Sequence, residues 1–87
     1  DQLQREKLKL MAELEKMGYK PIPSKTHFFL LPVNDGAAFR ARLFQEGLQV
    51  RDCASFGLPA YVRIAARLPE ENQKLLKAIE RASTENH

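Results

Sequence analysis

The chain has 87 residues, of which 44% are hydrophobic and 29% charged, with one cysteine, four glycines and five prolines. This length predicts a single domain, since domains average about 150 residues. The composition excludes collagen-like, low-complexity and strongly disordered chains. A domain this small buries only about 60–65% of its unfolded surface, so we expect any binding site to lie near the surface.

Cellular location is constrained by two features. The single cysteine, Cys53, has no partner for an internal disulfide, which favours a reducing compartment, the cytoplasm. No stretch approaches the roughly 20 apolar residues that cross a bilayer, and the first residues are charged, unlike a signal peptide. The chain begins at Asp1 and enters a helical pattern almost at once. We therefore expect a fragment of a longer protein that does not contact a membrane.

The net charge of +3 arises in one part of the chain. Between residues 40 and 67, five basic residues, all arginines, stand against two acids; they are Arg40, Arg42, Arg51, Arg63 and Arg67, with Glu46 and Asp52. A guanidinium offers a rigid donor fork that matches carboxylate and phosphate oxygens. Binding of a small anion is therefore favoured over a diffuse nucleic-acid surface, which would mix lysine with arginine. Solvated surface positions remain the simpler explanation for Arg40, Arg42 and Arg67.

The first half of the chain predicts a helix, a strand and a second helix. Apolar residues at helical spacing cover residues 3–17, and Gly18 can end that helix in the left-handed conformation. After a connector at 18–26, the apolar run at 28–31 predicts a strand buried on both faces that ends at Pro32.

The second half predicts a helix, two strands and a last helix. Asn34 or Asp35 can cap the helix that Gly47 ends, and a short strand at 48–51 leads into a polar loop at 52–59. The next strand, residues 60–66, places Tyr61, Arg63 and Ala65 on one face and Val62, Ile64 and Ala66 on the other. Pro69, Glu70 and Glu71 open a helix that buries Leu75, Leu76 and Ile79 and ends near Arg81. The order α-β-α-β-β-α predicts an α+β fold with about three strands and helices packed on the sheet.

Arg51 and Arg63 are the candidate site residues. One ends a strand and the other lies within the next, so neighbouring strands would bring the two guanidinium groups together. Two like charges repel unless an anion lies between them. That anion is either a ligand or one of the acids of the chain itself, Asp52 or Glu46, and the pattern leaves both possibilities open.

Other chemistries have weaker support. Cys53 could act as a nucleophile only with His27 as its base, and no third group orients that pair, so we assign no catalytic residue. His27, Cys53 and His87 lack the spacing of zinc ligands, so no metal is expected. Phe28 and Phe29 lack the glycine-flanked pattern of RNA-binding strands and are assigned to core packing, so no nucleic acid is expected.

Four segments resemble the C-terminal small domain of the histidinol-phosphate aminotransferase family. They read PSKTHFFLL at 23–31, VRDCASFGLP at 50–59, YVRI at 61–64 and PEEN at 69–72. The resemblance extends from about residue 8 to residue 79. The threonine-phosphate decarboxylase of cobalamin synthesis shares much of this series. The resemblance implies a domain of a fold type I enzyme that uses pyridoxal phosphate, with residues 1–87 as its small, substrate-recognition domain.

The resemblance also implies roles for particular residues. Arg63 matches the arginine that clamps the substrate carboxylate, and Arg51 matches one near a second anionic group, such as a phosphate. His27 departs from the family, which usually has asparagine there. In the family a lysine holds pyridoxal phosphate as a Schiff base, and none of the seven lysines here has the Ser-x-x-Lys context of that lysine. The chain alone is therefore expected to be inactive, with the cofactor bound mainly by the large domain of a parent enzyme.

The resemblance further implies that this parent enzyme is a cytoplasmic homodimer of amino-acid biosynthesis. Three functions then remain as alternatives: a domain of an aminotransferase acting on a small anionic amino acid, a domain of a threonine-phosphate decarboxylase, or a stand-alone basic α+β module that binds an anion or RNA. A reading frame extending some hundreds of residues upstream would favour the enzymes.

Overall fold

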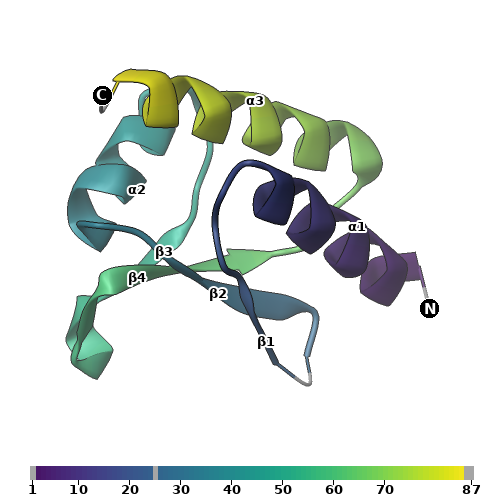
Figure 1. The fold of residues 1–87 in the computed structure, drawn as a ribbon, viewed down its shortest axis with the longest axis horizontal. Coiled ribbons are helices and arrows are strands. Elements are labelled where there is room, and N and C mark those ends of the chain that lie inside the picture. The colour runs from purple at the N-terminus through teal and green to yellow at the C-terminus, as the bar shows by residue number, and fades with distance from the viewer. Residues whose placement is uncertain (1, 25, 86–87) are drawn as a thin grey trace.

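Three helices lie on one side of an antiparallel sheet in a computed structural model that describes residues 2–24 and 26–85 (Figure 1). The helices are α1 (Gln2–Lys16), α2 (Gly36–Phe44) and α3 (Pro69–Glu85). The strands are β1 (Ile22–Pro23), β2 (Phe28–Pro32), β3 (Arg51–Cys53) and β4 (Leu58–Ala65), with the 3-10 turn η1 (Ala54–Phe56) between the last two. The predicted α+β class is confirmed, and none of the described helices is long and apolar enough to cross a membrane.

The sheet has the order β1-β2-β4-β3, and every neighbouring pair is antiparallel. The three predicted strands correspond to β2, β3 and β4. The fourth, β1, lies inside the predicted connector at 18–26 and pairs with β2. Its two residues are too few to show the alternation by which a strand is recognised in a sequence.

The pairing of β3 with β4 is irregular. The register places Arg51 opposite Arg63, Asp52 opposite Val62, and then Cys53 opposite Leu58. Residues 59–61 of β4 therefore lie between two successive pairs, which makes the ladder irregular at this point.

The predicted boundaries of β3 were wrong. The alternation at 48–51 suggested a strand there, but residues 48–50 belong to no strand, and pairing begins at Arg51. Residues 52–59 were predicted as a polar loop, yet Cys53 is buried and paired in the sheet, and β4 already begins at Leu58.

Strand β2 is covered on one face only, so the prediction of a strand buried on both faces was wrong for this chain. Phe29 and Leu31 are fully buried, whereas Phe28 and Leu30, which point the other way, are half-buried. The cause is the layering in Figure 1, because all the described helices cover the same side of the sheet. Pro32 is the last residue of β2, as predicted.

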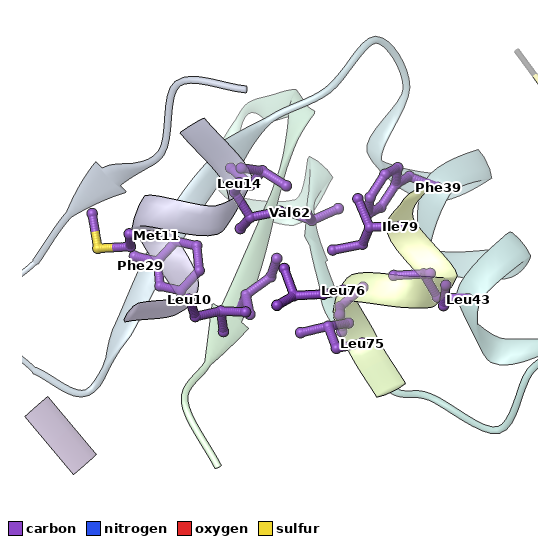
Figure 2. Close-up of a cluster of buried hydrophobic side chains, with 14 residues drawn as sticks. Leu10, Met11, Leu14, Phe29, Phe39, Leu43, Val62, Leu75, Leu76 and Ile79 are labelled. Atoms are coloured by element: carbon purple, nitrogen blue, oxygen red, sulfur yellow. The ribbon is translucent and has the colours of Figure 1, made fainter. Parts of the chain in front are cut away.

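The core lies between the covered face of the sheet and the helices (Figure 2). The strands contribute Phe29, Leu31, Val62 and Ile64, and the helices contribute Leu10, Met11, Leu14, Phe39, Leu43, Leu75, Leu76, Ala78 and Ile79. Burial of Val62 and Ile64 confirms the predicted division of β4 into two faces. Helix α3 continues to Glu85, beyond its predicted end near Arg81, and buries Ala82 in its additional turn.

The ends of the helices are fixed largely as predicted. Asp35 is the N-cap of α2, where its carboxylate accepts a bond from the Ala38 N–H at 3.2 Å. Gly18 and Gly47 have φ values of 97° and 80°, so each supplies the left-handed residue expected after its helix. Lys7 is buried on α1 and its ammonium donates to the carbonyls of Ser24 at 2.8 Å and Thr26 at 2.6 Å, which ties α1 to the turn between β1 and β2.

Candidate anion-binding site

Arg51 and Arg63 lie directly opposite each other on the neighbouring strands β3 and β4. Directly opposed residues of an antiparallel pair project from the same face of a sheet. That face points away from the helices, because Val62 and Ile64, which alternate with Arg63, are buried in the core. We call it the arginine face; its members are Phe28, Leu30, Pro32, Arg51, Tyr61, Arg63 and Ala65. The structure thus brings together the two arginines that the sequence singled out.

An aromatic ring lies against each guanidinium of this pair. The central carbon of Arg63 is 4.9 Å from the ring centroid of Phe28, and that of Arg51 is 5.9 Å from the ring centroid of Phe56. Both distances allow a cation–π attraction, which leaves the N–H donors at the edge of the guanidinium available to a ligand.

Neither phenylalanine was recognised as part of the site from the sequence. Phe28 was assigned to the core because it belongs to an uninterrupted apolar run, and Phe56 lay in a predicted loop. Only the register between β2 and β4 places Phe28 on the same face as Arg63.

Asp52 does not neutralise the arginine pair. One of its carboxylate oxygens accepts the backbone N–H of Ala54 at 3.1 Å, and the other lies 3.9 Å from a nitrogen of Arg40. Asp52 also alternates with Arg51 along β3 and so projects from the opposite face of the sheet.

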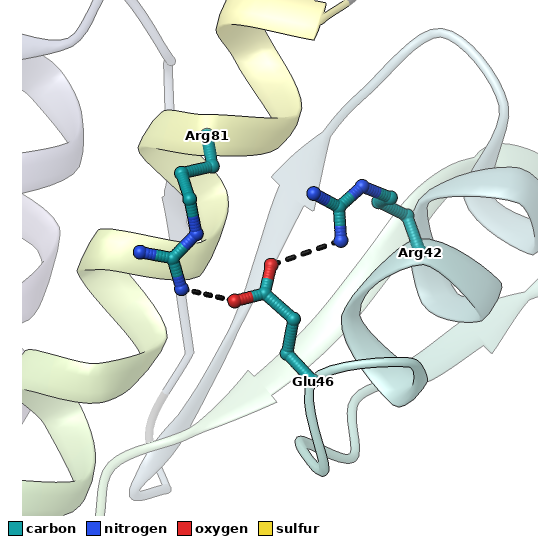
Figure 3. A network of polar contacts seen from close by, with 3 residues as sticks. All are labelled: Arg42, Glu46 and Arg81. Atoms are coloured by element: carbon teal, nitrogen blue, oxygen red, sulfur yellow. Dashed lines mark hydrogen bonds and ion pairs between the residues drawn. The ribbon is translucent and has the colours of Figure 1, made fainter.

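Glu46 does not neutralise the pair either, because two other arginines bind it (Figure 3). Its carboxylate accepts from Arg42 at 2.9 Å and also from Arg81 of α3. The hydrogen bond from Arg81 holds the pKa of the Glu46 carboxyl below its ordinary value, against a smaller opposing effect of burial. Within residues 2–24 and 26–85, neither Arg51 nor Arg63 takes part in an ion pair.

A cavity of about 450 Å³ adjoins Arg51 at the edge of the sheet. Its lining includes Arg40, Phe44, Val50, Arg51, Asp52 and Ser55. Arg63 is not part of this lining, so the cavity lies beside Arg51 and α2 at the edge of the sheet and not between the two arginines.

Cys53 is unsuited to nucleophilic chemistry. It is 2% exposed, and burial raises the pKa of its thiol, an effect that the nearby charge of Arg63 only partly offsets. His27 precedes β2, and β4 separates that strand from β3, which carries Cys53. Among the described residues no three potential metal-ligating side chains cluster, and His87 lies outside them.

The described lysines do not fit covalent attachment of a cofactor beside the arginine pair. They belong to α1, to α3 and to the connector after α1, and none belongs to a strand. The buried one, Lys7, is engaged by two backbone carbonyls. Among the described residues, none of the strands that form the arginine face therefore carries a lysine.

Comparison with known proteins identifies the family. Residues 1–79 match the family model of class I and II aminotransferases. The chain belongs to this family. A histidinol-phosphate aminotransferase of Pasteurella multocida is 43% identical over 77 residues, which cover 86% of this chain and 21% of that protein. The chain spans about a fifth of the length of the curated relatives it matches.

Solved structures of aminotransferase relatives have the same fold. The L-threonine-O-3-phosphate decarboxylase of Porphyromonas gingivalis superposes with a TM-score of 0.88 at 31% identity, over 95% of this chain and 27% of that one. The histidinol-phosphate aminotransferase of Clostridium acetobutylicum gives a TM-score of 0.86 at 25% identity, over the same shares of 95% and 27%. Enzymes of the class I and II family generally use pyridoxal phosphate.

Proposed function

We propose that residues 1–87 form the C-terminal substrate-recognition domain of a pyridoxal-phosphate aminotransferase resembling histidinol-phosphate aminotransferase. The family match and the short share of each relative that this chain covers support a domain of a larger enzyme. By analogy with the family, the parent enzyme would be a cytoplasmic homodimer of amino-acid biosynthesis.

The observation that carries this proposal is the pairing of Arg51 with Arg63 on the arginine face, with no acid of the described chain between them. In our proposal Arg63 binds the substrate carboxylate through its donor fork, and Arg51 contacts a second anionic group such as a phosphate. The strands hold both arginines at fixed positions before the substrate arrives. Binding at two points orients the substrate and lowers the entropic part of the activation barrier.

The cofactor would be held mainly by the rest of the parent enzyme, because none of the described lysines belongs to the strands that form the arginine face. The part played by this chain is to bind and orient the anionic substrate. We therefore expect the isolated chain to have no aminotransferase activity.

The test replaces Arg63 by lysine in the full-length enzyme. Lysine keeps the charge but loses the bidentate fork, so we expect kcat/KM for amino-group transfer from an α-amino acid, which carries the carboxylate, to fall at least about tenfold. Arg67→Lys is the matched control, since Arg67 follows the same strand but is exposed. Unchanged kinetics in Arg63→Lys would contradict the proposed role.

A second candidate function is decarboxylation of a phosphorylated amino acid. It is supported by the similarity to the Porphyromonas gingivalis decarboxylase, named for L-threonine O-3-phosphate. The full-length enzyme should be assayed with this compound for release of carbon dioxide and with histidinol phosphate for transfer of the amino group. Whichever product accumulates decides between the two reactions.

A further inference from the structure

We propose that Phe28 is a positioning residue of this site, whose ring holds the Arg63 guanidinium in the orientation that receives a carboxylate. The inference rests on the proposed function, because it assigns Phe28 a part in the same anion-binding site.

The sheet register places the two side chains in contact. Phe28 lies opposite Ala65, and Arg63 is two residues earlier on β4, so Phe28 and Arg63 are diagonal neighbours on the arginine face. Diagonal neighbours lie within reach of aromatic and long side chains. The distance of 4.9 Å from the guanidinium carbon to the ring centroid confirms the contact.

Phe28 does not contribute to the core, so core packing does not account for a large aromatic residue on this face. Its neighbour Phe29 is fully buried against the helices, whereas Phe28 is half-buried on the opposite face. Its ring contacts include the Arg63 guanidinium and, at 6.5 Å between centroids, an edge-on contact with His27.

The ring acts on Arg63 in two ways. It attracts the cation through its π face, and no carboxylate of the described residues competes for that cation. It also restricts a long side chain that would otherwise lose rotamer freedom when the ligand binds. Arg63 is thus ordered in advance, with the edge of its donor fork left for the substrate.

Arg51 provides an internal comparison. Its ring partner, Phe56, is 60% exposed and lies 5.9 Å from the guanidinium carbon, close to the limit of about 6 Å for this interaction. We therefore expect Phe56 to restrain Arg51 less than Phe28 restrains Arg63, and Phe56→Leu serves as the matched control.

The experiment measures binding of two ligands to the full-length enzyme loaded with its cofactor. L-threonine O-3-phosphate has a carboxylate and a phosphate, whereas O-phosphoethanolamine lacks the carboxylate. In isothermal titration, Phe28→Leu should weaken binding of the first compound by about 3- to 30-fold and leave binding of the second within about twofold. Phe28→Tyr, which keeps the ring, should bind both compounds as the wild type does, and Phe56→Leu should show a smaller loss than Phe28→Leu.

A double substitution separates positioning from a general structural effect. If Phe28 acts through Arg63, Phe28→Leu should cause no further loss of threonine-phosphate affinity in an Arg63→Gln enzyme. Additive losses, or equal losses for both ligands, would overturn the inference. Should Phe28→Leu not fold, Phe28→Met provides a second variant without the aromatic ring.

The two proposals fail in different ways. If the wild type binds neither compound, or Arg63→Gln binds threonine phosphate as tightly as the wild type, the proposed anion-binding role of Arg51 and Arg63 is wrong and this inference falls with it. If Arg63→Gln weakens binding while Phe28→Leu does not, only the role of Phe28 is rejected.

Discussion

Two pairs of arginines in this molecule differ in whether a carboxylate joins them. Arg42 and Arg81, from α2 and α3, both bind Glu46 and so connect two helices (Figure 3). Arg51 and Arg63, on neighbouring strands, have no acid of the described chain between them.

The difference separates a structural use of arginine from the binding use that we propose. Two cations that face each other repel, by about 1 kcal/mol at 4 Å in water and more in a less polar environment. Glu46 removes this repulsion for the first pair from within the chain. The second pair has no such acid, and its two guanidinium groups lie against the separate rings of Phe56 and Phe28. In our proposal, the substrate supplies the anion for this second pair.

The largest effect on activity is expected from a substitution that places a carboxylate on the arginine face. Leu30 lies directly opposite Arg63 on β2, on the same face. In the full-length enzyme, Leu30→Glu should form an internal ion pair that competes with the substrate carboxylate. We expect kcat/KM to fall at least about tenfold, since tenfold corresponds to only 1.4 kcal/mol.

Leu30→Gln is the control for this substitution, because glutamine has nearly the same size and no charge. It should retain most of the activity, and the thermal unfolding midpoint of Leu30→Glu should not fall below that of Leu30→Gln. Equal kinetics in the two variants would show that Arg63 does not bind the substrate.

A smaller effect, on stability, is expected from removing the carboxylate of Glu46, which joins the first arginine pair. Glu46→Gln should lower the thermal unfolding midpoint at pH 7, because it removes the charge that Arg42 and Arg81 share. The pKa of Glu46 is held below its ordinary value of about 4.5, so the carboxylate stabilises the fold fully above that pH. The difference in midpoint between wild type and variant should shrink as the pH falls through the lowered pKa of the folded state.

The control for this pH series is Glu13→Gln. Glu13 pairs with Lys16 at 3.2 Å on the surface of α1, and exposed pairs of this kind contribute little to stability. A gap between wild type and Glu46→Gln that stays constant down to pH 2 would mean that the carboxylate charge is not what joins the helices.

The smallest expected effect is on the reactivity of the Cys53 thiol, which responds to the charge of Arg63. Because burial raises the pKa of its thiol, iodoacetamide should alkylate Cys53 more slowly than free cysteine at pH 8. The charge of Arg63 acts in the opposite direction, so Arg63→Gln should slow alkylation further, by about twofold. Peptide mass spectrometry of the region around Cys53 measures the rate. Arg42→Gln should leave it unchanged, and a faster reaction in Arg63→Gln would contradict the expectation.

Much of the site was predictable because β4 alternates clearly. The alternation of Tyr61, Arg63 and Ala65 with Val62 and Ile64 was enough to separate a buried face from the face that carries Arg63. Helix α2 was equally clear, since Asp35 and Gly47 mark its two ends. These features depend on neighbours in the sequence, which a pattern records directly.

The features that were missed depend on contacts between distant segments. Phe28 belongs to the site only because β2 lies beside β4 in a particular register, and no local pattern contains that register. The alternation at 48–51 is a regular strand pattern, yet pairing starts at Arg51, where β4 is available. In both cases the tertiary arrangement, rather than local preference, decides the outcome.

The irregularity between Asp52 and Cys53 has a consequence for how such a domain can change during evolution. On one side of it, regular pairing holds Arg51 opposite Arg63. On the other side, residues 59–61 lie outside the regular register with β3. Insertions or deletions in the turn beyond the irregularity can therefore be absorbed there without shifting the arginines. Relatives could alter this turn, whose Ser55 lines the cavity beside Arg51, while Arg51 and Arg63 keep their register.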